Sequence, residues 1–294
     1  MRLLITGAWQ EAEKHMEAIQ AMGHEVLFFQ QERDPLPCDP GWVEGVICNG
    51  LFLYHPIEQF TSLRYIQLTS AGYDRVPMDY IREHGIEIHN ARGVYSIPMA
   101  EFAIAGVLSL YKKLDKFREQ QKAHIWEKDR SLLELYGKTV TIVGCGSVGA
   151  ECAKRFKAFG CTVIGVDIAI REDQFFDAIL PLSSLDDALV KADVVILTVP
   201  LTDETRGLID ARRLALIHGV MVNISRGAIV NQHALEAWDG SAVLDVFDQE
   251  PLDGYSLLWA KQNFIITPHN SFVGAGNGKR LADLIKSNLE ALQR

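Results

Sequence analysis

The stretch Gly144-Cys145-Gly146-Ser147-Val148-Gly149 decides the fold of the region around it. Residues 138–143 lead into it as a short β-rich segment, and residues 150–159 follow it with the apolar spacing of a helix. A second apolar strand, residues 161–166, then ends on Asp167, about twenty residues past the glycines. This order of strand, glycine turn, helix, strand and acidic residue is the setting in which a glycine-rich turn binds a dinucleotide. The sequence therefore predicts a nucleotide-binding βαβ unit, with a glycine turn of no function as the alternative.

Each glycine has its own physical task in such a unit. Gly144 permits the tight turn, Gly146 lets the backbone approach a pyrophosphate, and Gly149 lets helix and strand pack closely. The first helical residues, Ser147 and Val148, are expected to offer unpaired N–H groups and the positive end of the helix dipole to phosphate oxygens. We therefore expect these five residues to contact the cofactor.

Asp167 bears on the choice between the two nicotinamide dinucleotides. At the end of the second strand a carboxylate accepts hydrogen bonds from the ribose hydroxyls, and it repels the 2′-phosphate of NADP. The next three residues, Ile168-Ala169-Ile170, include no arginine that could hold that phosphate. The sequence therefore predicts NAD as the cofactor, with a solvated turn aspartate as the alternative interpretation.

Length and composition restrict the class of protein. A chain of 294 residues, 48% apolar and 23% charged, is typical of a globular protein with two domains. The net charge of −9 and the scattered basic residues argue against nucleic acid or an anionic membrane as partner, and no segment is apolar enough to span a bilayer. The five cysteines form no CxxC pair, which indicates reduced thiols and a cytoplasmic location. No histidine or cysteine group has metal-ligand spacing, so no metal site is expected.

The order of expected strands and helices predicts an α/β protein with two doubly wound parallel-sheet domains. Strands alternate with helices over residues 1–90, and a second series starts at Lys138. Between the two series, residues 99–114 form a long apolar helix whose small residues favour close packing against a second copy of the chain. The sequence therefore also predicts a homodimer.

Three polar side chains follow expected apolar strands in the second series, namely Arg226, Glu250 and His269. Ligands of doubly wound folds bind outside the carboxyl ends of the strands, so these side chains are expected at one ligand site. An arginine can grip a carboxylate and polarise a ketone, a histidine can give the proton, and a glutamate can orient the histidine ring. Reduction of a 2-oxo acid needs these three groups. Taken one at a time, they could instead be a structural ion pair, a loop carboxylate and an ordinary histidine.

These residues lie in motifs that resemble those of the D-isomer-specific 2-hydroxyacid dehydrogenase family. The motifs follow one another in the family's order over nearly the whole chain. They are GCGSVG, then Val199-Pro200-Leu201-Thr202 with Thr205, then SRG at 225–227, LDVF..EP at 244–251 and TPH at 267–269.

The resemblance implies an NAD-dependent oxidoreductase that transfers a hydride between nicotinamide and a D-2-hydroxy acid/2-oxo acid pair, with Arg226, Glu250 and His269 as catalytic residues. It also implies a Rossmann nucleotide-binding domain at residues 96–273. The implied substrate domain is flavodoxin-like and discontinuous, formed by residues 1–95 with 274–294, and a cleft is expected between the two domains. Two relatives of other kinds stay open as alternatives, an NAD-responsive regulatory binding protein and a formate- or phosphonate-type dehydrogenase on the same scaffold.

The resemblance also assigns the remaining site residues. Residues 47–54, which it places near the substrate, contain no lysine or arginine, so a phosphorylated substrate is not expected. The substrate is expected to contact Asn49, Gly50, Ser70, Ala71, Gly72 and Arg226. The cofactor is expected to contact Gly144, Gly146, Ser147, Val148, Gly149, Asp167, Val199, Pro200, Thr205, Ile224, Asp245 and His269.

Overall fold

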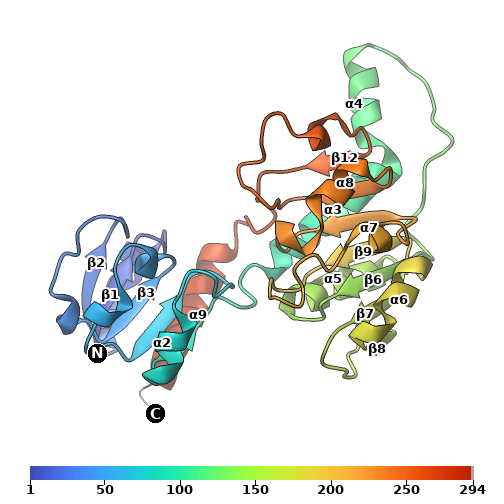
Figure 1. The fold of residues 1–294 in the computed structure, drawn as a ribbon. Helices are drawn as coiled ribbons and strands as arrows, with labels where there is room; N and C mark the ends of the chain where they lie inside the picture. Colours follow the sequence, from blue (N-terminus) through green and yellow to red (C-terminus); the bar gives the residue numbers. More distant parts are fainter. Residues whose placement is uncertain (293–294) are drawn as a thin grey trace. The chain divides into compact units, whose positions relative to one another are not determined.

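The computed structural model describes residues 1–292, and the chain divides into two compact units (Figure 1). Unit 1 comprises Met1–Tyr95 and Gly274–Arg294, and unit 2 comprises Ser96–Val273. Each unit has its own parallel β-sheet and its own apolar core. The predicted α/β fold with two parallel sheets is confirmed.

Unit 1 is built on a five-stranded parallel sheet with the order β2-β1-β3-β4-β5. The five strands are short and mostly buried, as expected for a parallel sheet covered on both faces. They are β1 (Arg2–Thr6), β2 (Glu25–Phe29), β3 (Gly45–Cys48), β4 (Tyr65–Leu68) and β5 (Glu87–His89). The helices of this unit are α1 (Met16–Ala21), α2 (Met78–Glu83) and α9 (Asn277–Ala291).

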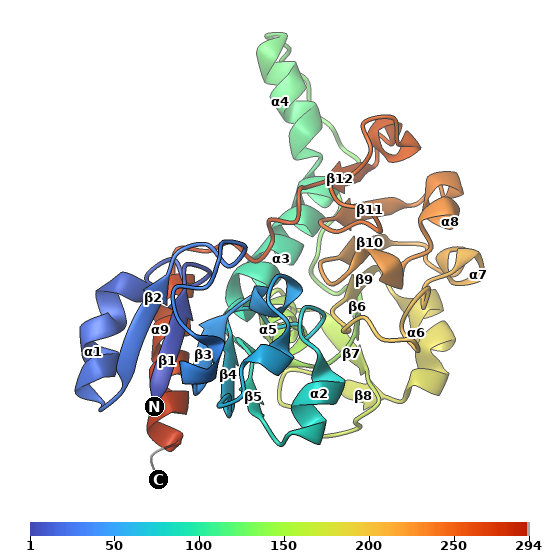
Figure 2. The same cartoon turned by 60° about the vertical axis from the view of Figure 1, so that its left-hand side comes forward.

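Helix α9 joins the unit 1 core although it lies at the far end of the sequence (Figure 2). Its buried residues, Leu281, Ala282, Ile285 and Leu289, recur at the spacing of one helix face. They pack in one cluster with residues of β1, including Leu3 and Ile5. The last helix therefore completes the fold of the first ninety-five residues.

Unit 2 is built on a seven-stranded parallel sheet with the order β12-β11-β10-β9-β6-β7-β8. This is the doubly wound arrangement in which the chain starts in the middle of the sheet and reverses direction at β6 and β9. The strands are β6 (Thr139–Val143), β7 (Thr162–Val166), β8 (Ala178–Leu180), β9 (Val194–Leu197), β10 (Val220–Asn223), β11 (Ser241–Leu244) and β12 (Phe264–Ile266). The helices are α3 (Ser96–Lys112), α4 (Leu114–Lys122), α5 (Ser147–Ala158), α6 (Leu185–Lys191), α7 (Ala211–Leu214) and α8 (Gln232–Ala237).

Helix α3 differs from its prediction in which surface its small residues contact. Ala100, Ala103 and Gly106 are buried in the core of unit 2. A Cβ atom on Gly106 would lie 2.7 Å from Val243 Cγ1, so the helix backbone sits directly on β11. These three small residues therefore serve packing within the unit, whereas Ala105 is exposed, and the dimer stays a prediction.

Helix α4 was not expected from the sequence. Lys113 adopts a left-handed conformation (φ 49°), which ends α3 and starts α4 in a new direction. Figures 1 and 2 both show α4 extending away from the rest of unit 2. The carboxylate of Asp129 ties the following loop to its base by ion pairs with Lys113 (3.0 Å) and Lys116 (2.8 Å). These hydrogen bonds, together with those from Ser131, hold the pKa of Asp129 well below its usual range.

No helix among residues 1–292 is long and apolar enough to cross a membrane.

Candidate active site

The glycine turn between β6 and α5 has the geometry that its sequence predicts. Gly144 has φ 96°, and a Cβ there would lie 2.8 Å from the backbone nitrogen of Val199. A Cβ on Gly149 would lie 2.1 Å from the carbonyl oxygen of Gly144, so only glycine lets α5 approach the turn. A Cβ on Gly146 would meet nothing within 4 Å. The open space over Gly146 and the N-terminus of α5 therefore fits a pyrophosphate group.

Asp167 lies at the end of β7, beside this turn. Its carboxylate accepts hydrogen bonds from the N–H groups of Cys145 (2.6 Å) and Ala169 (2.9 Å), which fixes its position at the glycine loop. Burial, with the charge of Asp167 as a second cause, raises the pKa of the Cys145 thiol to about 12. That thiol therefore stays neutral beside the turn.

Arg171, which was not among the predicted site residues, also reaches this region. It is the fourth residue after Asp167, and its guanidinium donates to the carbonyl oxygen of Cys145. An arginine therefore reaches the glycine turn even though Ile168-Ala169-Ile170 supplies none. The short separation of Arg171 from Asp167 in the sequence is the signal that could have identified it as a residue of this site.

Three further residues predicted to contact the cofactor, Thr205, Val199 and Ile224, make contacts within unit 2. The Thr205 hydroxyl donates to the Pro200 carbonyl (2.7 Å) and accepts from the Thr202 N–H (2.8 Å), so it closes the loop after β9. Val199 packs against the glycine turn at Gly144. The side chain of Ile224 is buried and packs in the apolar core of unit 2.

Arg226 follows β10 and is placed by a compact turn. The Asn223 side chain accepts from the Ser225 N–H (3.1 Å) and donates to the Arg226 carbonyl (3.0 Å). A Cβ on Gly227 would lie 1.9 Å from the carbonyl carbon of Phe247, so this turn packs directly on the segment that leads to Glu250. The Arg226 guanidinium donates to the carbonyl oxygen of Ser225 (2.8 Å) and is half-buried.

Glu250 and His269 form a hydrogen-bonded pair at the ends of neighbouring strands. The two residues follow β11 and β12, which are paired in the sheet. Glu250 Oε2 lies 2.7 Å from His269 Nδ1, and Glu250 Oε1 accepts from the Phe247 N–H (3.0 Å). Because Nδ1 is engaged by the carboxylate, Nε2 is the ring atom left for proton transfer. The side chains are 37% and 40% exposed, so a ligand can reach the pair.

His269 itself adopts a left-handed conformation, with φ 51°. A non-glycine residue keeps such a conformation only where its surroundings enforce it. The carbonyl of Asp245 accepts from the His269 N–H (2.8 Å), and its carboxylate accepts from Asn270 N–H (2.8 Å), Ser271 N–H (2.8 Å) and the Thr267 hydroxyl (2.6 Å). Asp245 is fully buried. Asp245 therefore stabilises the turn that carries His269. Its contact with the cofactor remains a prediction.

The loop after β4 in unit 1 presents unused N–H groups. Its carbonyl oxygens all accept hydrogen bonds: Ser70 from Ala91 N–H (2.8 Å), Ala71 from the Asn90 amide (2.6 Å) and Gly72 from the Ser70 hydroxyl (3.2 Å). Within residues 1–292 the N–H groups of Ala71 and Gly72 donate to no acceptor. Backbone N–H groups without an acceptor, on a loop whose carbonyls are fixed, can bind an anion such as a carboxylate.

The neighbouring loop, after β3, is different because its N–H groups are occupied. Glu32 accepts from the N–H groups of Asn49 and Gly50, both at 2.7 Å. Asn49 Oδ1 is buried and has no hydrogen-bond partner among the described residues. Glu32 precedes these residues by 17 and 18 positions and belongs to no motif, so no local pattern pointed to it. The backbone of Asn49 and Gly50 is thus committed to Glu32.

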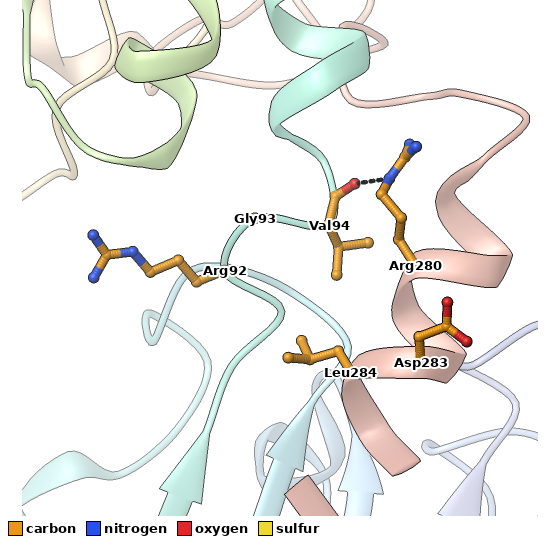
Figure 3. Close-up of a pocket in the computed structure, with 6 residues that line it drawn as sticks. All are labelled: Arg92, Gly93, Val94, Arg280, Asp283 and Leu284. Carbon is orange, nitrogen blue, oxygen red and sulfur yellow. Dashed lines mark hydrogen bonds between the residues drawn. The ribbon is translucent and has the colours of Figure 1, made fainter. Parts of the chain in front are cut away.

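One pocket of unit 1, of about 330 Å³, contains none of the predicted site residues. Arg92, Gly93, Val94, Arg280, Asp283 and Leu284 line it. Figure 3 shows the guanidinium groups of Arg92 and Arg280 pointing away from each other, and Arg280 Nε donates to the Val94 carbonyl (2.7 Å). The two cations therefore do not form a common anion site. No group of three metal-binding side chains occurs among the residues that the structure describes.

The chain is similar to known proteins in sequence and in fold. The model of the NAD binding domain of the D-isomer specific 2-hydroxyacid dehydrogenases matches residues 104–271. A glyoxylate reductase of Korarchaeum cryptofilum is 32% identical over 249 residues, which are 81% of this chain and 75% of that protein. A D-3-phosphoglycerate dehydrogenase of Methanocaldococcus jannaschii is 32% identical, over 72% of this chain and 42% of that protein. The crystal structure of a family member from Aeromonas salmonicida superposes with a TM-score of 0.85 and 31% identity, over 98% of this chain and 93% of that one.

Fold and relatives together define an NAD-dependent oxidoreductase of the hydroxy acid/oxo acid class. The chain belongs to the D-isomer specific 2-hydroxyacid dehydrogenase family. The resemblance found in its motifs is thereby confirmed.

Proposed function

We propose that this enzyme uses NADH to reduce a small, unphosphorylated 2-oxo acid, with glyoxylate as the first candidate. The observation that carries the proposal is the 2.7 Å contact between Glu250 and His269, beside the turn that bears Arg226. The relatives named glyoxylate reductases support the choice of substrate class. The lack of lysine and arginine in residues 47–54 argues against a phosphorylated acid such as the substrate of the phosphoglycerate relative.

The roles of the residues in unit 2 follow from their chemistry. NADH, when bound at the glycine turn, supplies the hydride that the carbonyl carbon accepts. Arg226 binds the substrate and polarises its carbonyl through its fixed guanidinium fork. His269 Nε2 gives a proton to the carbonyl oxygen, which completes the hydroxy acid. Glu250 holds Nδ1 and stabilises the protonated ring. In oxidation the same ring takes the proton back.

Unit 1 contributes binding groups in this proposal. The free N–H groups of Ala71 and Gly72 hold the substrate carboxylate, and Ser70 keeps their loop in shape through its hydroxyl. In the predicted contact of Asn49 and Gly50 with the substrate the N–H groups of these residues take no part, because they already bind Glu32. Their part is to border the substrate.

The direct test is a panel of 2-oxo acids assayed by loss of NADH absorbance. Glyoxylate, pyruvate, hydroxypyruvate and phosphohydroxypyruvate differ in the group attached to the 2-oxo carbon, which is a hydrogen, a methyl, a hydroxymethyl or a phosphorylated group. Turnover of glyoxylate or pyruvate above phosphohydroxypyruvate supports the proposal. Preference for the phosphorylated acid would reverse the substrate assignment, and NADH binding without turnover of any acid would favour a regulatory binding protein.

We also propose a homodimer and a cytoplasmic location. The arm formed by α4 and the loop after it exposes large apolar side chains, which mark a protein–protein contact. Ile125, Trp126, Leu133 and Tyr136 are 51%, 98%, 50% and 77% exposed. All five cysteines are free thiols, which suits a reducing compartment. Mass measurement in solution at micromolar concentration tests the dimer.

A further inference from the structure

We propose that Glu32 selects against substrates that carry a second anionic group, so that the enzyme takes 2-oxo acids with a single carboxylate. This inference rests on the proposed function and narrows its substrate class. All the groups that carry it lie at the carboxyl edge of the unit 1 sheet.

Glu32 is held firmly by three donors. Its Oε1 accepts from the Thr6 hydroxyl and the Asn49 N–H, and its Oε2 accepts from the Gly50 N–H, each at 2.7 Å. These donors come from the ends of β1 and β3, so the side chain reaches from the end of β2 across the end of β1. A carboxylate bound by three donors keeps its position.

The charge of Glu32 is not neutralised by a cation. Among the described residues Glu32 makes no ion pair. Arg75 passes nearby: a Cβ on Gly50 would lie 3.5 Å from Glu32 Oε2 and 3.9 Å from Arg75 Cδ. The two side chains therefore flank the same face of Gly50. Glu32 also lines an open pocket of about 380 Å³ with Gly7, Ala8, Gln30, Gln31, Arg33 and Tyr54, so its surroundings are accessible to a small molecule.

The free N–H groups of Ala71 and Gly72 lie on the adjacent loop. Strands β3 and β4 pair with Cys48 opposite Leu68, and the Thr69 N–H donates to the Cys48 carbonyl (2.9 Å). The loop of Asn49 and Gly50 is thus the direct neighbour of the loop that we assign to the substrate carboxylate. An acid bound there meets the negative charge of Glu32 on the β3 side. A second carboxylate or a phosphate on that acid is repelled, whereas a hydrogen or a neutral group is not.

Removal of the Glu32 carboxylate should weaken this preference for acids with a single carboxylate. In Glu32→Ala the N–H groups of Asn49 and Gly50 would lose their acceptor. In Glu32→Gln the amide oxygen can still accept from one of them, but the negative charge is gone, and Arg75 would remain beside them in both variants. Two adjacent N–H donors and an arginine form a favourable site for an anion. The variants are therefore expected to gain substrates that the parent refuses.

The experiment compares kcat/KM for glyoxylate with kcat/KM for 2-oxosuccinate and 2-oxoglutarate. Glu32→Ala and Glu32→Gln should each raise the ratio of dicarboxylic to monocarboxylic activity at least tenfold, which is about 1.4 kcal/mol. Asp34→Ala is the matched control, because it removes the same charge two residues away. Its ratio should equal that of the parent.

The outcomes separate this inference from the proposed function. If the parent reduces no 2-oxo acid, the proposed function fails. If glyoxylate is reduced but the ratio stays at the parent value in a folded Glu32→Gln, the inference about Glu32 is wrong. Thermal melting and circular dichroism report folding, and Glu32→Gln decides the matter should Glu32→Ala unfold. An equal rise in Asp34→Ala would also overturn it, since the effect would then come from net charge.

Discussion

Two carboxylates, one in each unit, accept the same pattern of hydrogen bonds but differ in burial. Asp245 in unit 2 and Glu32 in unit 1 each accept hydrogen bonds from one threonine hydroxyl and from two consecutive backbone N–H groups. For Asp245 the donors are Thr267, Asn270 and Ser271, and for Glu32 they are Thr6, Asn49 and Gly50. Asp245 is fully buried, and Glu32 is half-buried. Burial thus separates a carboxylate that shapes the backbone from one whose charge a ligand can sense.

The difference in burial indicates different functions for the two carboxylates. The donors of Asp245 enclose His269, so that carboxylate fixes the direction of a reacting side chain. The donors of Glu32 carry no reacting side chain, and Glu32 lines an open pocket. Chemistry is thus expected to depend on the edge of the unit 2 sheet, and selection of substrate on the edge of the unit 1 sheet.

The largest effect should come from the reacting side chain itself. His269→Ala removes the proton donor, so kcat should fall by about 10²- to 10⁴-fold, the usual contribution of general acid–base catalysis. NADH binding, measured by fluorescence titration, should change far less than kcat, because the glycine turn is unchanged. Near-normal kcat in His269→Ala would remove the basis for placing chemistry in unit 2.

A somewhat smaller loss is expected for Arg226→Lys. The lysine keeps the charge but cannot form the planar two-pronged contact, so most of the activity should disappear, by about 100-fold in kcat/KM. Arg212→Lys is the control, since Arg212 pairs with Asp186 at the surface of the same unit. Equal losses in the two variants would show that Arg226 has no special role.

A further test concerns Asp167 and the cofactor. The parent should prefer NADH to NADPH by at least tenfold in kcat/KM, about 1.4 kcal/mol. Asp167→Ala removes the charge that repels a 2′-phosphate and should reduce this preference, helped by Arg171 at the same turn. Direct titration with NADH and NADPH gives the binding ratio independently of turnover. Equal use of both cofactors by the parent would contradict the role of Asp167.

The smallest effect is expected for Glu250→Gln. Glu250 Oε2 lies 2.7 Å from His269 Nδ1, where it fixes the ring orientation that leaves Nε2 for proton transfer. Glutamine keeps the shape of the side chain but lacks its charge, so kcat for reduction should fall by less than the roughly 100-fold lower limit expected for loss of the proton donor itself. An unchanged kcat in a folded Glu250→Gln would mean that Glu250 does not act through His269.

The sequence predicted most of unit 2 because its signals are local. The turn Gly144–Gly149, its strand and its helix lie within one short segment, and the structure shows the predicted close approaches at Gly144 and Gly149 and open space over Gly146. Arg226 and His269 follow strands whose apolar runs are plain in the sequence. What the sequence did not give are contacts between distant segments: Glu32 with Asn49, and α3 with β11 through Gly106. Such contacts depend on how strands are ordered in the sheet, and no motif encodes that order.

The most direct test of this division of labour compares Asp245→Asn with Glu32→Gln on the same two substrates. In Asp245→Asn an amide N–H₂ faces backbone N–H donors, so the turn of His269 shifts and kcat should fall about 10- to 100-fold. This loss should be equal for glyoxylate and 2-oxosuccinate, so that their ratio is unchanged. Glu32→Gln should instead raise the ratio at least tenfold. An altered ratio in Asp245→Asn, together with an unaltered ratio in Glu32→Gln, would contradict the account.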